Sequence, residues 1–558
     1  MIEPAAAPAG GRKTILDFRD AGSPAWPFAA IAVLLAAQAT MIFTHAVNWD
    51  ESLHYGQLYD MAAGQPVNAL QTLYLRLYLW VPTLPGTAID HIVVARIGQF
   101  AIEMAILALI FALARRFADT RHAAVAVLLY LSTGYVLQNG FALRADPAVT
   151  AVLMAMLVVL SRPSFGWGAA VALGLLGGLA PMLSIKAVLY APALAGMAWL
   201  CWSEADRSPK VAIRLVAAGA IAGVAAAALF AWHSSIFASA DTAVGGSVSL
   251  ADAAARRMFF IGRPNNLGTW LQFALTGLAF LALVGISALS VARDRRKAAE
   301  RVALAGLLVL FLLPFCYENT AAYFYVFMLA PVAAACAIGV QRIEKLVPAI
   351  VLTAVLVAFA VPVIATDNRD VIGNQRRLAA ELEAMFPTPV AYFDHADVAP
   401  HLIKRNPFQS PWGYRGYLAA GVPIYREAME REVVPVLVAN WFTFRDLFAG
   451  DDELFLAADA EALRDNYLPF NGPIRLAGKR VPVGPARETE VLVPGPYTVH
   501  DAAVLIDGER HEAGDVVTLD RGHHLFASAD PARDARLFWG RHMAPRDPLD
   551  FAASWVEF

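Results

Sequence analysis

Two neighbouring carboxylates, Asp50 and Glu51, follow the first long apolar segment of the sequence. A carboxylate that lies beside apolar helices at a membrane boundary can have a shifted pKa and act as a general base. The alternative is structural, because aspartate is a common cap of the helix that follows it. Asp50 would then cap a helix that begins at Glu51, and the residues alone leave both roles open.

A second group of charges, Arg144 and Asp146, comes just before another apolar segment. Pro147 suits the first position of a helix, and Asp146 suits the cap before it. Capping therefore explains Asp146 but does not explain Arg144. An arginine at the mouth of a helix bundle can bind an anion.

Lys186 lies between two closely joined apolar segments. A lysine in that place is costly unless its ammonium group reaches the lipid headgroups or has a partner. The two interpretations are therefore snorkelling and pairing with a phosphate. The loop 233–266 has a similar anion-binding character, which comes from Arg256, Arg257 and Arg263, although these arginines would also suit a solvated loop face.

Two tyrosines, Tyr323 and Tyr325, stand at the start of a late apolar segment. An aromatic belt at the membrane surface would account for both of them. The more specific alternative is that they stack on a sugar or contact a lipid phosphate.

The composition indicates which elements must position these residues. The 558 residues are 58% hydrophobic and only 16% charged, and the mean hydropathy is +0.51. Ordinary globular chains are roughly 45–50% apolar and about 25% charged. The chain is therefore an integral membrane protein with a soluble part. A net charge of −3 gives no sign of a nucleic-acid partner.

Eleven segments are apolar enough to be candidate membrane spans, since a span needs about 20 mostly apolar residues. They are residues 27–46, 91–114, 122–138, 146–161, 168–184, 187–202, 211–232, 267–291, 302–316, 321–340 and 346–365.

The basic residues of the loops predict the orientation. One alternating set of loops carries 17 lysines and arginines, and the opposite set carries 6. Because the richer side is normally cytoplasmic, the amino terminus is expected in the cytoplasm. Eleven spans then place the part after residue 366 outside. In a bacterium this corresponds to a multi-pass protein of the inner membrane with a periplasmic C-terminal region.

The C-terminal part has the composition of a soluble protein and two kinds of pattern. A helical pattern at 374–386, apolar strands at 389–394 and 433–440, and a short helix at 426–431 predict an α/β unit. Short β runs separated by turns over 485–545 predict a small β-sandwich or meander. We therefore expect a transmembrane domain at 1–366, an external α/β domain at 367–484 and a small external β-rich domain at 485–558.

Taken together, these residues resemble the GT-C class of membrane glycosyltransferases, and most of all its family 39-like group. That group includes protein O-mannosyltransferases and transferases that add aminoarabinose to lipid A. The similarity covers about residues 27–366. It rests on Trp49-Asp50-Glu51, on Arg144 with Asp146, on Gly178-Leu179-Ala180 followed by Lys186, and on the tyrosine-rich segment that ends at Leu329-Ala330-Pro331. The family usually has glycine or proline after the lysine, whereas Ala187 follows Lys186 here.

The resemblance implies a sugar donor carried on a polyprenyl phosphate and transfer with inversion to a glycan, lipid or protein acceptor. Asp50 would be the general base, and Glu51 would assist it. Lys186, Arg144, the arginines of loop 233–266 and the two tyrosines would contact the donor. Asp146 would orient a substrate. The sequence requires no cofactor and leaves room for a divalent metal.

Two other functions compete with this one. A transporter or flippase of lipid-linked sugars would also be a polytopic membrane protein, but the span lengths show no two-fold repeat. A non-enzymatic glycan-assembly protein is the third candidate, because the β-rich tail could bind glycan.

Overall fold

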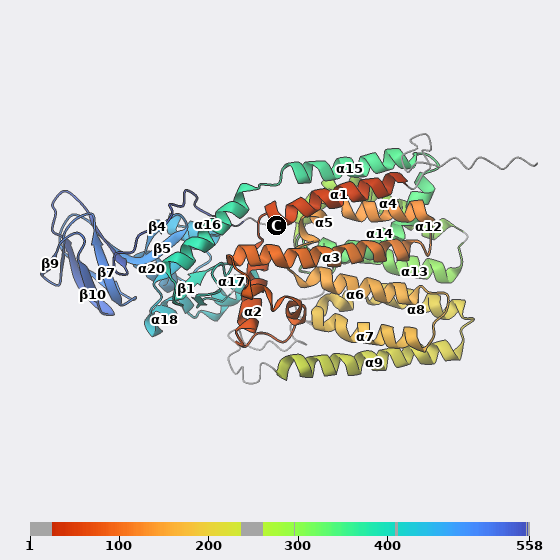
Figure 1. Ribbon diagram of the computed structural model, residues 1–558, viewed down its shortest axis with the longest axis horizontal. Coiled ribbons are helices and arrows are strands. Elements are labelled where there is room, and N and C mark those ends of the chain that lie inside the picture. Colours follow the sequence, from red (N-terminus) through yellow and green to blue (C-terminus); the bar gives the residue numbers. More distant parts are fainter. Residues whose placement is uncertain (1–24, 236–259, 295, 408–410, 554, 556–558) are drawn as a thin grey trace, which may run out of the picture.

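The computed structural model describes residues 25–235, 260–294, 296–407, 411–553 and 555. It consists of a helical bundle followed by a mixed α/β tail, which extends from one end of the bundle (Figure 1). We call this end of the bundle the tail-side end. The helix α1 (Ala25–Thr44) finishes there, and α3 (Ala88–Ala114) begins there.

Helices fill the predicted membrane part. Besides α1 and α3, the described residues form α4 (Thr120–Leu131), α5 (Gly134–Asn139), α6 (Ala145–Leu160), α7 (Trp167–Leu183), η3 (Ile185–Tyr190), α8 (Ala191–Glu204), α9 (Pro209–Ser234), α11 (Leu267–Thr276), α12 (Leu278–Arg293), α13 (Ala298–Leu308), η5 (Val309–Phe315), α14 (Phe324–Ile343) and α15 (Ala349–Ala365). Each of the eleven predicted segments coincides with one of these helices or with two consecutive ones.

Length and composition divide these helices into two groups. Within the described residues, seven helices are long and apolar enough to cross a membrane, and an eighth crossing arises if α11 and α12, bent by 86°, form one broken span. The helices α4, α6 and α7 are apolar but shorter. A membrane domain with seven or eight candidate spans is therefore present, and eleven crossings stay a prediction.

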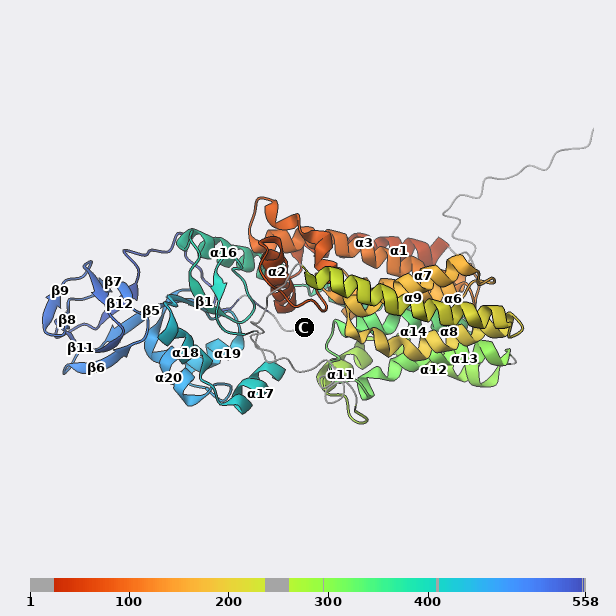
Figure 2. The same ribbon diagram turned by 90° about the horizontal axis from the view of Figure 1, so that it is seen from below.

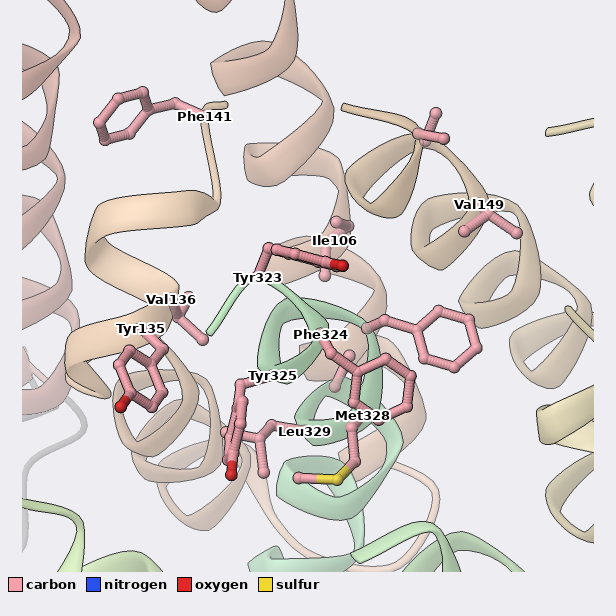
Figure 3. Packing of buried hydrophobic residues seen from close by; sticks show 14 of the residues in the cluster. Ile106, Tyr135, Val136, Phe141, Val149, Tyr323, Phe324, Tyr325, Met328 and Leu329 are labelled. Carbon is pink, nitrogen blue, oxygen red and sulfur yellow. The ribbon is translucent and has the colours of Figure 1, made fainter. Parts of the chain in front are cut away.

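The core of the bundle surrounds α14. Every side chain from Phe324 to Val340 on this helix is buried. Figure 3 shows part of this packing, in which Phe324, Met328 and Leu329 lie against side chains of the neighbouring helices. By contrast, α9 buries few of its side chains and lies at one edge of the bundle (Figures 1 and 2).

A short helix and a loop cover the tail-side end. The helix α2 (Trp49–Ala62) lies across this end, and two 3₁₀ turns follow it, η1 (Leu73–Tyr78) and η2 (Val81–Thr83). The amide of Val47 donates to Gln375 at 2.7 Å, and the Gln375 side chain donates back to the Val47 carbonyl at 2.8 Å. These bonds join the tail to the segment that leads into α2.

The tail alternates helices and strands in its first part and is mainly β in its second. Its described elements are α16 (Asp370–Met385), β1 (Ala391–Asp394), β2 (Ile403–Lys404), α17 (Pro411–Ala420), α18 (Ile424–Arg431), β3 (Val436–Val438), α19 (Phe442–Ala449), α20 (Ala457–Asn466), β4 (Tyr467–Asn471), β5 (Ile474–Val481), β6 (Arg487–Val491), β7 (Gly495–His500), β8 (Val504–Ile506), β9 (Glu509–His511), β10 (Val516–Leu519), β11 (Gly522–Ser528) and β12 (Ala535–Trp539).

These strands form two sheets. The larger has the order β10-β7-β12-β5-β3-β1-β2, with β4 also paired to β5, and the smaller has the order β6-β11-β8-β9. The strands β1, β2 and β3 run parallel, whereas β3, β5, β12, β7 and β10 pair antiparallel. The larger sheet therefore joins strands from both sides of residue 484. The division of the tail at that residue stays a prediction.

Candidate active site

The start of α2 leaves the Asp50 side chain free of a capping role. Asn48 is the N-cap, and its side chain accepts a hydrogen bond from the Asp50 amide at 2.8 Å. Glu51 completes a capping box by accepting from the Asn48 amide at 3.0 Å. The alternative that Asp50 caps a helix beginning at Glu51 is therefore wrong, because Asn48 already fills that position.

Four buried side chains form a row of alternating charge at the tail-side end. Arg144 donates through Nη1 to Asp50 Oδ2, and its Nε lies 3.4 Å from Asp146 Oδ2. Lys186 Nζ donates to Asp146 Oδ1 at 2.8 Å. We call Asp50, Arg144, Asp146 and Lys186 the charged row. It brings together residues from three widely separated parts of the sequence.

Asp146 is also not a helix cap. The helix α6 begins at Ala145, so Arg144 is the N-cap residue and Asp146 lies inside the first turn. The Asp146 carboxylate instead binds two cations. For Lys186, this ion pair replaces the snorkelling alternative, because the ammonium group is buried against a carboxylate.

Asp50 is the most accessible member of the row. Its side chain is 12% exposed, against 6% for Arg144 and 5% for Asp146. Within the described residues, Asp50 Oδ1 makes no hydrogen bond, while Oδ2 is held by Arg144. One carboxylate oxygen is thus fixed, and the other can accept a proton.

The ring of Tyr323 packs against the cations of the row. Arg144 Cζ lies 3.4 Å from the ring centroid, and Lys186 Nζ lies 4.8 Å from it. The Tyr323 hydroxyl donates to Asn319 Oδ1 at 2.8 Å, which fixes the ring. A cation held over an aromatic face is stabilised by about 0.5–2 kcal/mol.

The other residues that were predicted to contact the donor lie away from the charged row or outside the residues that the structure describes. Tyr325 packs in the core beside Tyr135 (Figure 3), with their ring centroids 5.0 Å apart. On its other side lies Phe273, with ring centroids 4.8 Å apart. Arg263 is exposed. Arg256 and Arg257 lie outside the described residues.

Glu51 forms an ion pair with Arg96 inside the protein. Its Oε1 accepts from Arg96 Nε at 2.8 Å and from the Leu143 amide at 2.9 Å, and its Oε2 lies 2.5 Å from Arg96 Nη2. Burial raises the pKa of Glu51, but the charge and hydrogen bonds of Arg96, together with the hydrogen bonds from the Leu143 and Asn48 amides, outweigh burial, so the pKa is lower than usual. Since its oxygens have these partners, Glu51 is suited to hold Asp50 and Leu143 in place.

One face of α3 supports the segment that carries Arg144. Arg96 acts there through Glu51, and Gln99 donates to the Arg144 carbonyl at 3.2 Å. One helical turn further on, Glu103 accepts from Gln38 at 3.0 Å, and Gln38 also donates to the carbonyl of Leu137 at 3.1 Å. This polar face fixes the backbone on both sides of the break after α5.

Two further residues, His54 and Tyr74, border the row and were not among the predicted site residues. Their rings lie 5.8 Å apart, and His54 follows Asp50 by one helical turn. Burial, together with the charge of Arg144, lowers the pKa of His54 to about 4, so this side chain is neutral near pH 7. Among the described residues, neither Tyr74 Oη nor His54 Nδ1 has a hydrogen-bond partner.

The sequence held a signal for some of these missed residues. Arg96, Gln99 and Glu103 are polar residues inside a predicted span, at a spacing of one helix face. Such residues in a membrane helix are costly and usually have partners or a function. His54 stands four positions after Asp50, which places both on one face of α2. Tyr74 gave no such signal.

Metal-ligating side chains do not gather in the described part of the chain. Within these residues, there is no group of three or more His, Cys, Asp and Glu side chains that could hold a metal ion.

Comparisons by sequence found no relative. No protein-family model matches the chain, and no curated protein matches it.

Comparison of folds found similar solved structures. Apo ArnT from Cupriavidus metallidurans is 12% identical, with a TM-score of 0.49 over 76% of this chain and 95% of that chain. ArnT bound to undecaprenyl phosphate is 14% identical, with a TM-score of 0.45 over 65% and 71%. The apo oligosaccharyltransferase of Archaeoglobus fulgidus is 13% identical, with a TM-score of 0.45 over 74% and 69%. The chain is thus similar in structure to two GT-C membrane glycosyltransferases.

Proposed function

We propose that this protein is a membrane glycosyltransferase that moves a sugar from a polyprenyl-phosphate donor to an acceptor hydroxyl. The observation that carries the proposal is the charged row, in which a partly open carboxylate lies beside buried cations at the tail-side end of the bundle. A general base and a cation site are the two things that this transfer requires.

Asp50 is the general base in this mechanism. Its Oδ1 takes the proton of the acceptor hydroxyl while the acceptor oxygen forms a bond to the anomeric carbon of the donor. The bond between that carbon and the phosphate oxygen breaks, and its electron pair leaves with the polyprenyl phosphate. Because attack and departure occur on opposite faces, the configuration at the anomeric carbon inverts.

Lys186 and Arg144 stabilise the leaving phosphate. The ammonium group of Lys186 has three protons, and within the described residues it makes one side-chain hydrogen bond, to Asp146. It can therefore bind a phosphate oxygen without giving up Asp146. Cations placed where negative charge develops commonly account for the largest part of such a rate enhancement.

The remaining acidic residues have supporting roles. Asp146 orients Lys186 and Arg144 toward the donor, since its carboxylate binds both. Glu51 positions Asp50 through the start of α2 and positions Arg144 through the Leu143 amide.

We further propose that the bundle crosses a bacterial inner membrane eleven times, with the amino terminus in the cytoplasm and the tail in the periplasm. The support is the excess of basic residues in one set of loops. An alkaline phosphatase fused after residue 558 should be active, and a β-galactosidase fused there should be silent. The reverse pattern would contradict this topology.

The reaction is tested with purified protein and a radiolabelled polyprenyl-phosphate sugar. Transfer of label to a glycan, lipid or protein acceptor, with release of polyprenyl phosphate, supports the proposal. A flippase would move the donor across a vesicle membrane without consuming it. A non-enzymatic assembly protein would leave the donor unchanged on its own side, and either result would refute the transferase.

A further inference from the structure

Arg76 on η1 joins the tail-side loop to the end of α9. Its Nε donates to His233 Nδ1 at 2.8 Å, and its Cζ lies 4.3 Å from the ring centroid of Trp232. The other ring nitrogen of His233, Nε2, lies 3.0 Å from Thr72 Oγ1. The guanidinium group is thus oriented on one side by a hydrogen bond and on one face by an aromatic ring.

These hydrogen bonds fix the charge of the cluster. Because His233 Nδ1 accepts from Arg76, the ring proton is on Nε2, which donates to Thr72. Thr72 in turn donates to the carbonyl of Asn68. His233 is therefore neutral, and in the described part of the chain no carboxylate forms an ion pair with Arg76.

One end of the guanidinium group has no partner among the described residues. Arg76 Nη2 is inaccessible to solvent, and among the described residues it has no hydrogen-bond acceptor. A buried donor of a charged group is costly to leave unsatisfied, and native structures rarely do so. An acceptor from outside the described residues is the simplest explanation.

The surroundings of Arg76 indicate where that acceptor comes from. Leu77, Trp80 and Trp232 are 61%, 54% and 52% exposed, although all three are large and apolar. Trp232 lies in the last turns of α9, which is one of the long apolar helices. Exposed tryptophans beside an arginine at the end of a membrane helix are typical of the headgroup level of a bilayer.

We propose that Arg76, His233 and Trp232 form a binding site for the phosphate group of a membrane phospholipid. The phosphate would bind the Arg76 guanidinium group, and Leu77 and Trp80 would contact the lipid next to it. The site is separate from the charged row. Tyr74 of η1 packs against His54 of α2, whereas Arg76 contacts α9.

Native mass spectrometry of the full-length protein in detergent tests this site. The probe is phosphatidylglycerol, compared with a diacylglycerol of the same chains, which lacks the phosphate. Arg76→Gln should lower the bound fraction of phosphatidylglycerol about tenfold or more, because a hydrogen bond to a charged group is lost. Arg76→Lys should lose less, since it keeps the charge. The matched control is Arg369→Gln, which removes an exposed arginine at the start of the tail and should leave binding unchanged.

Three results would overturn the site. The first is equal phosphatidylglycerol binding by wild-type protein and Arg76→Gln. The second is diacylglycerol binding as tight as that of phosphatidylglycerol, since the phosphate would then have no part. The third is a loss of polyprenyl phosphate binding in Arg76→Gln with phosphatidylglycerol binding intact, because the site would then belong to the donor lipid. Retained polyprenyl phosphate binding in Arg76→Gln, together with loss of phosphatidylglycerol, supports it.

Discussion

Buried charges have different partners in the tail and at the tail-side end of the bundle. In the tail, Asp394 accepts from the backbone amides of Ala396 and Val398 at 3.2 and 2.6 Å. Lys479 donates to the carbonyls of Asp465 and Glu490, and also to the side-chain oxygen of Asn466, which is a neutral amide. In the bundle, the members of the charged row bind one another.

This difference in partners distinguishes charges that stabilise the fold from charges that can bind a substrate. A charge that is bound to backbone groups stabilises one local conformation and cannot change partner without unfolding it. A charge that is bound to another side chain can exchange that partner for a ligand of the same charge. A charged substrate can therefore bind to members of the charged row. The tail charges that are bound to the backbone instead stabilise loops.

The largest effect on activity is expected from Asp50→Asn. The amide keeps the shape of the side chain but cannot accept the acceptor proton, so transfer should slow by about 10²–10⁴-fold. Some stability should be lost, because Asp50 pairs with the buried Arg144, but Arg144 keeps Asp146 as a second carboxylate, and Asn48 rather than Asp50 caps α2. The measurement is the rate of sugar transfer at saturating donor and acceptor.

Asp60→Asn is the matched control for this change, because Asp60 lies on the same helix but is exposed. It should keep wild-type turnover. If Asp50→Asn also keeps wild-type turnover, Asp50 is not the base, and the assignment moves to Glu51 or Asp146.

The largest effect on stability is expected from Arg96→Met. This change leaves Glu51 buried without its cation, which typically costs about 3–5 kcal/mol. The exposed pair of Arg377 with Asp550 provides the contrast, since Arg377→Met should cost less than about 1 kcal/mol. Equilibrium unfolding in mixed detergent micelles measures both. Equal losses in the two variants would contradict a structural role for Glu51.

A smaller effect is expected on donor affinity. Lys186→Ala should weaken donor binding roughly tenfold to a hundredfold, as expected for a charge-assisted contact of about 1.5–3 kcal/mol. Lys186→Arg should recover part of this, although a guanidinium fork does not replace a point charge. The affinity for the acceptor should change little. A donor titration at saturating acceptor is the measurement, and an unchanged donor dependence would exclude Lys186 from the phosphate site.

Hydropathy and periodicity were sufficient to predict the helices of the bundle and part of the tail, but they did not predict α17, α19, α20, β2, β4, β5, β9 or β12. Each of the predicted apolar segments is helical. The helical pattern at 374–386 corresponds to α16, which ends one residue earlier, at Met385. The β runs after residue 485 correspond to β6, β7, β8, β10 and β11. These signals are local. The pairing of β5 with β12 joins segments more than fifty residues apart, and no local pattern encodes it.

The candidate site was predicted as residues but not as contacts. Asp50, Arg144, Asp146, Lys186 and Tyr323 were chosen because charged and aromatic residues at membrane boundaries are unusual. Their pairing depends on how the helices pack. The sequence therefore could not show whether Arg144 binds Asp50 or a substrate. The two capping alternatives were wrong because another residue is the N-cap in each case. Asn48 is the N-cap of α2, and α6 begins one residue earlier than predicted, which makes Arg144 its N-cap.

A moderate effect is expected from the ring of Tyr323. Tyr323→Leu removes the aromatic face beside Arg144 and Lys186, which should weaken donor binding about 3- to 30-fold, as expected from 0.5–2 kcal/mol. Tyr323→Phe keeps the ring and loses the hydrogen bond to Asn319, so it should retain most of the affinity. Tyr325→Phe is the control in the core and should have no effect. Equal losses for leucine and phenylalanine at 323 would assign the role to the hydroxyl instead.

The smallest effect is a dependence of stability on pH that arises from His54. Because its pKa falls to about 4 in the folded protein from an ordinary 6.5, the unfolded chain binds an extra proton between these values. Stability should therefore fall as the pH decreases through this range, by about 1 kcal/mol between pH 7 and pH 5.5. The His54→Gln variant should lack this part of the decrease, whereas His523→Gln, which alters a more exposed histidine of the tail, should keep it. Unfolding in mixed micelles at the two pH values measures the difference. If His54→Gln loses as much stability as the wild type over this interval, His54 is not held neutral beside the charged row. The difference between buried charges at this end of the bundle and in the tail would then be limited to the four residues of the row.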